Sequence, residues 1–393
     1  MLMTTTGYPG HLLPLVPFAR ACVQAGHDVR IAGPRFCEGQ VARLGLAFQG
    51  CTNPSDQEIE ALVASVASLP RRDGHARMMA HGFACVAART ILADLVELVG
   101  AWQPDIVLHE SQEFAAGLAA ERHDVPHARV ALGLSSTEEE TFSLVAAEVD
   151  GLRVALGLPR DPHGEQLRAA PSFTLMPAAL ERPGGPAPRV GHRFREVRDG
   201  AAAPPDCWTD GEAPAVYLTF GSVAGSLGFF PRLYRAAIER LAGVHARVLI
   251  TTGDGADLAE LGPLPPNVHA ERWVAQESVL AHAAAVICHG GSGSVLGALA
   301  HGLPIVAVPI FGGDQWHNAR RVADVGAGIA LEGQRAERRM LDGPEPAVLD
   351  ALPNAIEAVL RDPAYRRAAL RIAGAIDALP PVDSAVDVMQ TIV

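Results

Sequence analysis

The stretch that most constrains the fold of this chain is a short apolar run that leads directly into a glycine-rich turn and an apolar helical segment. Ala285 to Cys288 fits a buried parallel strand, and Ser294 to Leu299 fits the helix that follows. The turn between them, residues 289–294, has the sequence H-G-G-S-G-S. Because such a turn has little side-chain bulk and free N–H groups at a helix N-terminus, it predicts an α/β protein with a diphosphate-binding turn. A merely flexible glycine loop is the alternative.

Candidate binding residues flank this turn on both sides. Trp273 offers a flat ring for a base, and Gln276 offers an amide for a sugar hydroxyl. Asp314 and Gln315 follow the next apolar run, residues 305–308, again at the end of a predicted strand. Ligands of open parallel sheets bind at the carboxyl ends of the strands. We therefore expect these side chains and the glycine-rich turn to serve one ligand.

The ordered set W-x-x-Q, H-x-G-x-x-S and D-Q, which runs from Trp273 to Gln315, resembles the nucleotide-sugar signature of the glycosyltransferases that decorate natural products. It resembles most the bacterial antibiotic and macrolide branch, in the same family as the plant UDP-glucosyltransferases. The resemblance implies the GT-B fold, an α/β architecture in which two Rossmann-like domains face a cleft. It also implies that the residues binding the nucleotide sugar are Gly221, Ser222, Trp273, Val274, Gln276, His289, Gly291, Gly293, Ser294, Asp314 and Gln315.

The first turn of the chain carries a candidate catalytic base. His11 follows the predicted first strand, residues 2–5, and lies near a helix N-terminus, whose partial positive charge keeps an imidazole neutral, as a general base must be. G-H-L-L-P at residues 10–14 is similar to the G-H-x-x-P of the family, so the resemblance implies that His11 is the catalytic base. A histidine that only caps the turn is the alternative. Because the first strand is shorter than those of the family, we also expect a few residues to be missing from this start.

A carboxylate partner for this base is predicted at the end of the strand that begins at Pro104. Glu110 matches the family position whose carboxylate, usually Asp, orients the catalytic histidine, and Glu lengthens the reach by one methylene. The adjacent His109 would point to the opposite face of a continuing strand, so it is the weaker candidate. A solvated loop carboxylate is the alternative role for Glu110.

The region between these two candidates is helical in pattern. Residues 53–103 carry apolar side chains at helical spacings, and R-R-D-G at 71–74 interrupts them. The resemblance implies that this region and residues 137–152 shape the pocket for a hydrophobic acceptor.

A Pro/Gly/Ala-rich, charged run separates two stretches in which strands and helices alternate. We predict an N-terminal acceptor-binding domain at residues 1–200, a linker at 201–213 and a C-terminal nucleotide-sugar-binding domain at 214–393. The resemblance implies that the last helix, from about Tyr365, returns to pack on the first domain.

Composition excludes several classes of function. A net charge of -12 without a basic stripe argues against nucleic acid as a partner. The first six residues lack the basic start and apolar core of a signal peptide, and His, Gly and Pro interrupt the most apolar stretch, residues 283–311. We therefore expect no membrane insertion. The 6 cysteines contain no C-x-x-C pair, which favours reduced thiols in the cytoplasm over a disulfide framework or a metal site.

The resemblance implies an inverting, metal-independent transfer of a sugar, with a deoxysugar favoured, from a dTDP- or UDP-sugar to a hydroxyl of a hydrophobic natural product in antibiotic biosynthesis. No cofactor is expected beyond this co-substrate. Family members that use UDP-sugars often carry a Glu shortly after the phosphate-binding Ser, where it grips the ribose hydroxyls. Gly297 occupies that place here and favours a dTDP-sugar. The sugar, the acceptor, a homodimeric state and the need for a separate activator protein stay open.

Other functions fit the sequence less well. An NAD-dependent oxidoreductase needs G-x-G-x-x-G at a first β-α turn, and a serine hydrolase needs G-x-S-x-G; neither pattern occurs where it should. Two alternatives remain open: a catalytically silent auxiliary or binding protein of the same fold, and a nucleotide-sugar epimerase. W-x-x-Q followed by D-Q argues against the epimerase, and the presence of both His11 and Glu110 argues against a silent protein.

Overall fold

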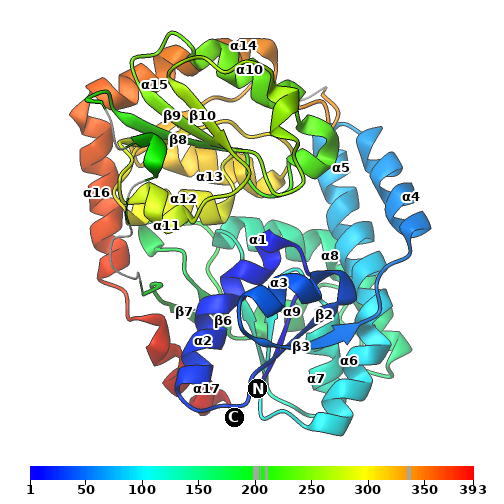
Figure 1. Ribbon diagram of the computed structural model, residues 1–393. Coiled ribbons are helices and arrows are strands. Elements are labelled where there is room, and N and C mark those ends of the chain that lie inside the picture. The colour runs from blue at the N-terminus through cyan, green and yellow to red at the C-terminus, as the bar shows by residue number, and fades with distance from the viewer. Residues whose placement is uncertain (198–202, 204, 209–210, 334–337) are drawn as a thin grey trace. The chain divides into compact units, whose positions relative to one another are not determined.

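Parallel strands form the centre of each half of the chain in the computed structural model (Figure 1). The structure describes residues 1–197, 203, 205–208, 211–333 and 338–393. They divide into two units: unit 1 comprises residues 1–176, 181–197 and 379–393, and unit 2 comprises residues 177–180 and the described residues from 203 to 378. Each unit has one all-parallel sheet between helices, so the predicted class of two Rossmann-like α/β domains is confirmed.

The sheet of unit 1 has the strand order β3-β2-β1-β4-β5-β6-β7. Its strands are β1 (Leu2–Thr4), β2 (Arg30–Pro34), β3 (Ala47–Cys51), β4 (Val107–Glu110), β5 (His127–Val130), β6 (Ser172–Thr174) and β7 (Gly191–Arg193). Alternate side chains enter two different cores, as the strand period requires. Met3 and Leu108 pack in the core beneath α2 (Val16–Gln24) and α17 (Ala385–Ile392), whereas Leu2 and Val107 pack in the core beneath α6 (Ala88–Trp102) and α7 (Ala115–Arg122).

The remaining helical elements of unit 1 connect these strands. They are α1 (Pro9–Leu12), η1 (Leu13–Leu15), η2 (Arg35–Cys37), α3 (Glu38–Arg43), α4 (Asp56–Ala67), α5 (Arg71–Arg77), the π-helix η3 (Met78–Ala87), α8 (Ser135–Ala155), α9 (Glu165–Ala169) and η8 (Val382–Ser384). The helix α2 starts at Val16, so Pro17 stands in its first turn, where a missing N–H costs nothing. Gly26, with a φ of 87°, follows the end of that helix.

The helical region between β3 and β4 is interrupted earlier than predicted. Residues 71–74 lie inside α5, and the break falls at Ser68 to Pro70, where Pro70 is the N-cap of α5. The prediction of a break at R-R-D-G was wrong because a glycine costs a helix only about 1 kcal/mol, which the buried position of Gly74 offsets. From α5 onwards the chain continues through the π-helix into α6.

The sheet of unit 2 has the strand order β10-β9-β8-β11-β12-β13. Its strands are β8 (Ala215–Thr219), β9 (Arg247–Thr251), β10 (Val268–Glu271), β11 (Ala285–Cys288), β12 (Ile305–Ala307) and β13 (Gly328–Ala330). Its helical elements are η4 (Ala178–Leu180), η5 (Asp206–Trp208), the π-helix η6 (Gly225–Phe229), α10 (Arg232–Leu241), η7 (Leu258–Leu261), α11 (Gln276–Leu280), α12 (Ser292–Ala300), α13 (Gly313–Asp324), α14 (Pro346–Asp350), α15 (Leu352–Arg361) and α16 (Pro363–Asp377). One core of this unit lies between the sheet and α10, α14 and α15.

Both sheets reverse their strand order between two neighbouring strands. In unit 1 the reversal lies between β1 and β4, and in unit 2 between β8 and β11. Loops that leave the carboxyl ends of such strands diverge, which opens space for a ligand. In unit 1, His11 follows β1 and Glu110 is the last residue of β4. In unit 2, Gly221 follows β8 and His289 follows β11.

The chain returns from unit 2 to unit 1 near its end, later than predicted. The apolar side of α16, including Ile372 and Ile376, is buried in unit 2, where this helix packs on α12. Only residues 379–393 belong to unit 1, and there α17 lies beside α2 (Figure 1). Arg195 binds this returning segment by donating its N–H to Pro380 O at 2.9 Å and accepting from Val382 N at 2.9 Å. The return therefore starts at Leu379 instead of Tyr365.

The predicted linker at 201–213 is only partly described. Residues 201, 202, 204, 209 and 210 lie outside the described residues. Within the rest, Trp208 is buried, and its carbonyl accepts a hydrogen bond of 2.6 Å from Nη1 of Arg247 on β9. This part of the predicted linker therefore packs on unit 2. Residues 177–180, which were predicted in the first domain, also belong to unit 2, because η4 packs on α16.

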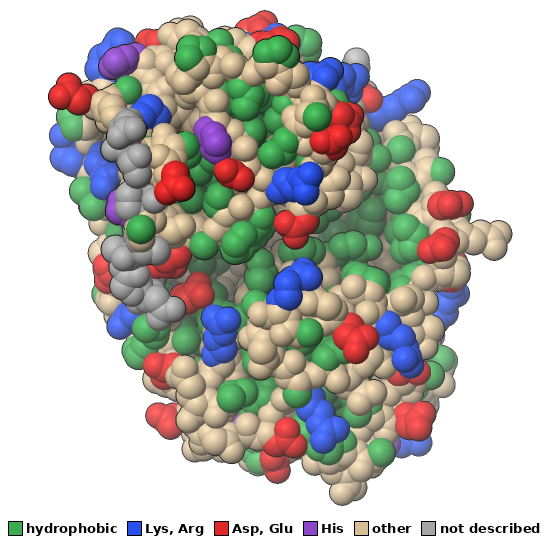
Figure 2. Space-filling model, in the orientation of Figure 1, with side chains coloured by type: hydrophobic (Ala, Val, Ile, Leu, Met, Phe, Trp, Pro, Cys, Tyr) green, Lys and Arg blue, Asp and Glu red, His purple; other side chains and the backbone are tan. Residues whose placement is uncertain are grey.

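The surface drawn in Figure 2 is mixed in charge, and the cysteines are free thiols. On the face drawn in Figure 2, positive and negative side chains are interspersed, without a continuous basic stripe among the residues drawn in colour. Cys22, Cys37, Cys51 and Cys288 are buried free thiols, and Cys85 and Cys207 are half-buried free thiols. Within the described part of the chain, every helix is too short or too polar to cross a membrane.

Candidate active site

His11 and Glu110 form a hydrogen-bonded pair at the point where the strand order of unit 1 reverses. β1 ends at Thr4, the turn that follows uses Gly7 at a φ of 92°, and His11 lies in the short helix α1. Its Nδ1 lies 2.9 Å from Oε1 of Glu110, the last residue of β4. The His11 side chain is 16% exposed and that of Glu110 is 0% exposed. The pair fixes the ring so that Nδ1 faces the carboxylate and Nε2 is the nitrogen free to accept a proton.

The Glu110 carboxylate is held by the turns around it. Its Oε1 accepts hydrogen bonds from Thr6 N at 3.2 Å and from Thr6 Oγ1 at 3.0 Å, and its Oε2 accepts from Gln112 N at 2.7 Å. These donors satisfy a carboxylate that is removed from water. The extra methylene of Glu relative to Asp therefore still allows the predicted contact with His11, and Glu110 is a buried strand residue rather than a solvated one.

Aromatic rings pack around the imidazole of His11. Phe83, on the π-helix, stacks on it with ring centroids 5.0 Å apart and an interplanar angle of 28°. Tyr8 approaches its edge, with centroids 6.1 Å apart. The structure therefore encloses the candidate base partly in apolar surface. Sequence reasoning did not single out either ring, although Tyr8 lies three residues before His11.

His109 points away from this pair, as the alternation of the strand predicts. Its Nε2 lies 3.3 Å from Nδ1 of His127 on β5. Burial and, next, the neighbouring His127 lower the pKa of His109 to about 3, so the ring is neutral at ordinary pH. It lines a small internal cavity with His127, Arg129 and Phe142. His109 therefore packs inside unit 1, away from the pair of His11 and Glu110.

Two buried carboxyl groups near the pair were missed by sequence reasoning. Glu113 accepts hydrogen bonds from Thr4 Oγ1 at 2.5 Å and from Ala115 N at 2.7 Å, which ties the end of β1 to the start of α7. Glu138 on α8 accepts from Ser111 Oγ at 2.9 Å. Burial raises the pKa of each carboxyl group to about 7. Glu113 lies one residue before the N-cap of α7, and its position near a helix start was the available sequence signal.

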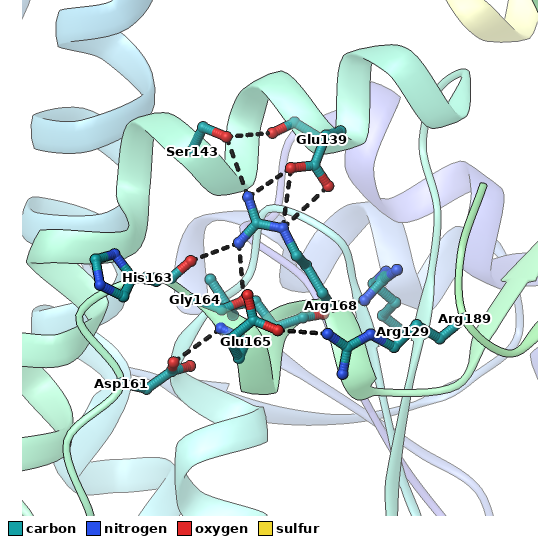
Figure 3. Close-up of polar contacts among 10 residues, drawn as sticks. Arg129, Glu139, Ser143, Asp161, His163, Gly164, Glu165, Arg168 and Arg189 are labelled. Atoms are coloured by element: carbon teal, nitrogen blue, oxygen red, sulfur yellow. Dashed lines mark hydrogen bonds and ion pairs between the residues drawn. The ribbon is translucent and has the colours of Figure 1, made fainter. Parts of the chain in front are cut away.

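Part of the predicted acceptor region, residues 137–152, makes contacts within unit 1. Figure 3 shows Arg168 of α9 reaching α8, where its Nε donates to Glu139 Oε1 at 2.9 Å and its Nη2 donates to Ser143 Oγ at 3.1 Å. Asp161 anchors the start of α9 by accepting from Glu165 N at 2.8 Å. This face of α8 therefore binds α9.

The glycine-rich turn of unit 2 has the predicted strand-turn-helix form. β11 ends at Cys288 and α12 begins at Ser292, with Gly291 as an N-cap that makes no side-chain hydrogen bond. The first N–H groups of the helix therefore lack a capping side chain. A Cβ atom at Gly293 would meet nothing within 4 Å, so the turn is open to a ligand at this position.

Two glycines of this site make room for the imidazole of His289. A Cβ atom at Gly221 would lie 2.7 Å from Nε2 of that ring, and a Cβ atom at Gly291 would collide with the same nitrogen. Removal of the ring from water lowers the pKa of His289 to about 4. His289 is therefore neutral at ordinary pH and can offer an N–H group, but no positive charge, to a phosphate. Gly290, with a φ of 86°, is required by the backbone of Gln315, which a Cβ atom would approach to 2.6 Å.

Gln315, which is predicted to bind sugar hydroxyls, makes hydrogen bonds to the backbone of the loop before it. Its side-chain oxygen accepts hydrogen bonds from Ile310 N at 2.9 Å and Phe311 N at 3.1 Å, and the residue is 3% exposed. It therefore holds the loop between β12 and α13. Asp314 lies beside it in the first turn of α13. Asn318, which we did not predict, donates through Nδ2 to Gly290 O at 2.9 Å and so ties α13 to the glycine-rich turn.

The residues predicted to bind the base and ribose lie around α11. Trp273 is 68% exposed, and Val274 beside it is half-buried. Gln276 is the first residue of α11, and its buried Nε2 has no hydrogen-bond partner among the described residues. A Cβ atom at Gly297 would lie 3.1 Å from that nitrogen. Gln276 and Gly297 are therefore neighbours. Across the described ranges, no group of three or more His, Cys, Asp or Glu side chains could hold a metal ion.

Comparisons with known proteins cover most of the chain. The family model "Erythromycin biosynthesis protein CIII-like, N-terminal domain" matches residues 20–151, and the corresponding C-terminal model matches residues 235–391. The chain is 31% identical to L-demethylnoviosyl transferase of Streptomyces niveus, over 84% of each chain. It is 28% identical to 4'-demethylrebeccamycin synthase of Lentzea aerocolonigenes, over 100% of this chain and 99% of the relative. Among solved structures, glycosyltransferase SnogD from Streptomyces nogalater has a TM-score of 0.75 at 24% identity and covers 100% of this chain and 99% of its own.

Proposed function

Since the chain belongs to the family of erythromycin biosynthesis protein CIII-like proteins and is a glycosyltransferase of the GT-B fold, we propose that it is an inverting, cytoplasmic enzyme of antibiotic biosynthesis. In this proposal it transfers a sugar from a dTDP-sugar to a hydroxyl of a hydrophobic natural product. The observation that carries the proposal is the hydrogen bond between His11 Nδ1 and Glu110 Oε1 at the switch point of unit 1. A buried carboxylate that orients an imidazole is the arrangement a general base requires. The relation to the plant UDP-glucosyltransferases is supported by the ordered signature alone.

In the proposed reaction, Glu110 holds the Nδ1–H of His11 and stabilises the imidazolium that forms. Nε2 takes the proton of the acceptor hydroxyl while its oxygen attacks the anomeric carbon of the sugar. The bond from that carbon to the diphosphate oxygen breaks, and the nucleoside diphosphate leaves with the bonding electrons. Because the oxygen attacks from the side opposite the leaving group, the configuration inverts. The nearby stack of Phe83 keeps the imidazole in one orientation.

We assign the donor to the residues of unit 2. The N–H groups at the start of α12 and the positive end of its dipole meet the charge that develops on the leaving diphosphate, with Ser222 and the neutral His289 as further donors. Trp273 provides the exposed ring for the base, and Asp314 binds sugar hydroxyls. Gln315 acts on the loop that presents Asp314.

We infer that glycine at position 297, next to Gln276, favours dTDP over UDP, because a glutamate that could bind the ribose 2′-hydroxyl is missing there. A glutamate at position 297 would grip a ribose 2′-hydroxyl, but its Cβ would approach Gln276 Nε2 to 3.1 Å, which is tight for both groups. With glycine in that place, a deoxyribose loses no contact relative to ribose. The neighbouring structures include VinC in complex with dTDP, and for this chain that complex supports the same nucleotide.

Thermal unfolding tests the donor. A ligand that binds only the folded protein stabilises it by about 2.7 kcal/mol at a hundred times its dissociation constant. We expect dTDP to raise the unfolding temperature more than UDP at equal concentration, and NAD to leave it unchanged. Equal shifts would remove the dTDP assignment, and the absence of a shift with both nucleotides would favour a silent protein of the same fold.

Turnover of dTDP-glucose with alizarin as acceptor tests the base. His11→Ala is expected to lower kcat by about 10²- to 10⁴-fold, because proton transfer in the transition state is lost, while the affinity for dTDP stays the same. His245→Ala, at an exposed histidine of unit 2, is the control and should keep kcat. Full turnover by His11→Ala would overturn the mechanism without affecting the assignment of the donor site.

A further inference from the structure

Exposed aromatic rings are rare in this chain and two of them stand together. Every aromatic residue of the chain lies among the described residues, and Tyr8 (40% exposed), Phe36 (51%) and Trp273 (68%) are the exposed ones, whereas the others are half-buried or buried. Trp273 is assigned above to the base of the donor. Tyr8 and Phe36 belong to unit 1, and their ring centroids lie 5.5 Å apart. Exposed apolar rings that gather at one place mark a binding surface more often than a packing defect.

The two rings extend a row that includes the candidate base. The centroid distances along the row are 5.5 Å from Phe36 to Tyr8, 6.1 Å from Tyr8 to His11 and 5.0 Å from His11 to Phe83. Tyr8 and Phe36 form the exposed end of the row, whereas His11 and Phe83 are half-buried. An apolar molecule on the exposed end would therefore lie beside the imidazole.

The backbone holds the ring of Phe36 in place. A Cβ atom at Gly7 would lie 2.9 Å from two atoms of this ring, so the ring rests directly on the glycine backbone. The N–H of Phe36 donates to Asn53 Oδ1 at 3.0 Å. A Cβ atom at Gly10, which precedes His11 in α1, would meet nothing within 4 Å, so there is space at this position. The exposed rings are thus fixed in advance next to an open position.

We propose that Tyr8 and Phe36 form a stacking platform for the acceptor and that they select a planar aromatic ring bearing a hydroxyl group over a saturated acceptor of similar size. The platform rests on the proposed function, since it presents that hydroxyl to His11. Aromatic rings attract one another in offset-stacked and edge-to-face geometries beyond the gain from buried area. The tilt of 48° between the two rings allows one planar ring to make both kinds of contact. A saturated ring gains the buried area alone.

Binding of two hydroxylated probes to the full-length protein tests the platform. Alizarin is the planar aromatic probe and cyclododecanol is the saturated one, and isothermal titration calorimetry measures both affinities. We expect Phe36→Leu and Tyr8→Leu each to weaken alizarin by about 2- to 10-fold and cyclododecanol by less than about 2-fold, because leucine keeps an apolar surface but removes the ring. Tyr8→Phe, which keeps the ring, should bind alizarin as the wild type does.

Val23→Ala, at an exposed apolar side chain of α2 in the same unit, is the control and should leave both affinities unchanged. The affinity for dTDP, measured on every variant, reports on folding and on the donor site separately. The platform is overturned if the two leucine variants bind alizarin like the wild type, if they weaken both probes equally, or if the wild type binds no alizarin. If the wild type does not bind dTDP, the proposed function is overturned instead. The ratio of the alizarin and cyclododecanol affinities would still show whether Tyr8 and Phe36 select an aromatic ring.

Discussion

At the scale of single residues, the site of unit 1 is defined by the surroundings of three buried carboxyl groups, those of Glu110, Glu113 and Glu138. Glu110 accepts hydrogen bonds from two N–H groups and from the Thr6 hydroxyl in addition to its contact with His11. Glu113 and Glu138 lie nearby, and burial raises the pKa of each to about 7, with the charge of Glu110 acting in the same direction. Burial thus favours the neutral form of Glu113 and of Glu138.

The raised pKa of Glu138 predicts a pH dependence of stability. Its value of about 7 in the folded protein lies above the ordinary 4.5, so between these pH values the folded protein binds more protons than the unfolded chain. The contribution is fully present below pH 4.5 and is lost as the pH rises through 7, by about 3 kcal/mol at most. Glu138→Gln keeps an acceptor for Ser111 and has no such dependence.

Urea unfolding from pH 5 to pH 8 checks this expectation. The stability of the wild type relative to Glu138→Gln should fall by up to about 3 kcal/mol over this range. Glu38→Gln, at an exposed glutamate of α3, serves as the control and should change in parallel with the wild type. If Glu138→Gln also follows the wild type, the pKa of Glu138 is not raised in the folded protein.

At the scale of elements, the glycines of the strand-turn-helix unit serve two different purposes. Gly290 and Gly291 are required by packing, against the backbone of Gln315 and the ring of His289 respectively. Gly293 meets nothing within 4 Å, so packing does not explain it. We attribute Gly293 to the close approach of the diphosphate, which a side chain would block.

Gly293→Ala separates these purposes. Alanine favours a helix over glycine by up to about 1 kcal/mol, so the unfolding temperature should stay the same or rise. The affinity for dTDP should fall by at least about 10-fold, since a methyl group would occupy the turn. Gly374→Ala in α16 is the matched control, because its Cβ also meets nothing within 4 Å, and it should leave dTDP binding unchanged. Normal dTDP binding by Gly293→Ala would show that the diphosphate does not contact this turn.

The helical region of unit 1 illustrates what an element-level pattern leaves undetermined. Residues 78–87 form a π-helix that carries Phe83 against His11. A spacing of apolar residues that suits an α-helix also tolerates the wider turn, since both bury one face. The position of Phe83 follows from this local widening and from the packing of α8 on the π-helix, so it was not predictable from periodicity.

At the scale of the whole molecule, the end of the chain completes the core of the unit that contains the start. Met389 on α17 is 0% exposed and shares the core of unit 1 with α2, where its sulfur lies 3.7 Å from Sγ of Cys22. Met389→Ala should destabilise unit 1 by about 2–5 kcal/mol, because it leaves a cavity in this core. Hydrogen exchange should accelerate in β1, β2 and α2.

The affinity for dTDP should not change in Met389→Ala, because the nucleotide is assigned to unit 2. Gln390→Ala, at the exposed neighbouring position, is the control and should leave hydrogen exchange unchanged. Faster exchange in unit 2 alone would contradict the assignment of residues 379–393 to the core of unit 1.

The sequence by itself determined the parallel α/β class, the strand and helix around the glycine-rich turn, and the order of the candidate residues. These follow from local rules: apolar runs of strand length, helical periodicity, and glycines between them. Because parallel strands place their carboxyl ends on one edge, it was also possible to predict that residues after different strands serve one site. The hydrogen bond between His11 and Glu110 was expected on this basis together with the family resemblance.

Only the tertiary structure decided which of these side chains are free to act on a ligand. Gln315 and Asn318 are occupied by backbone groups, His289 is kept neutral between two glycines, and Glu113 and Glu138 are buried beside Glu110. It also decided that the chain returns to unit 1 at Leu379, and that Tyr8 and Phe36 stand in one row with His11. The physical reason is common to all of them. Burial, desolvation and ring packing depend on residues that are far apart in the sequence, and no local pattern contains that information.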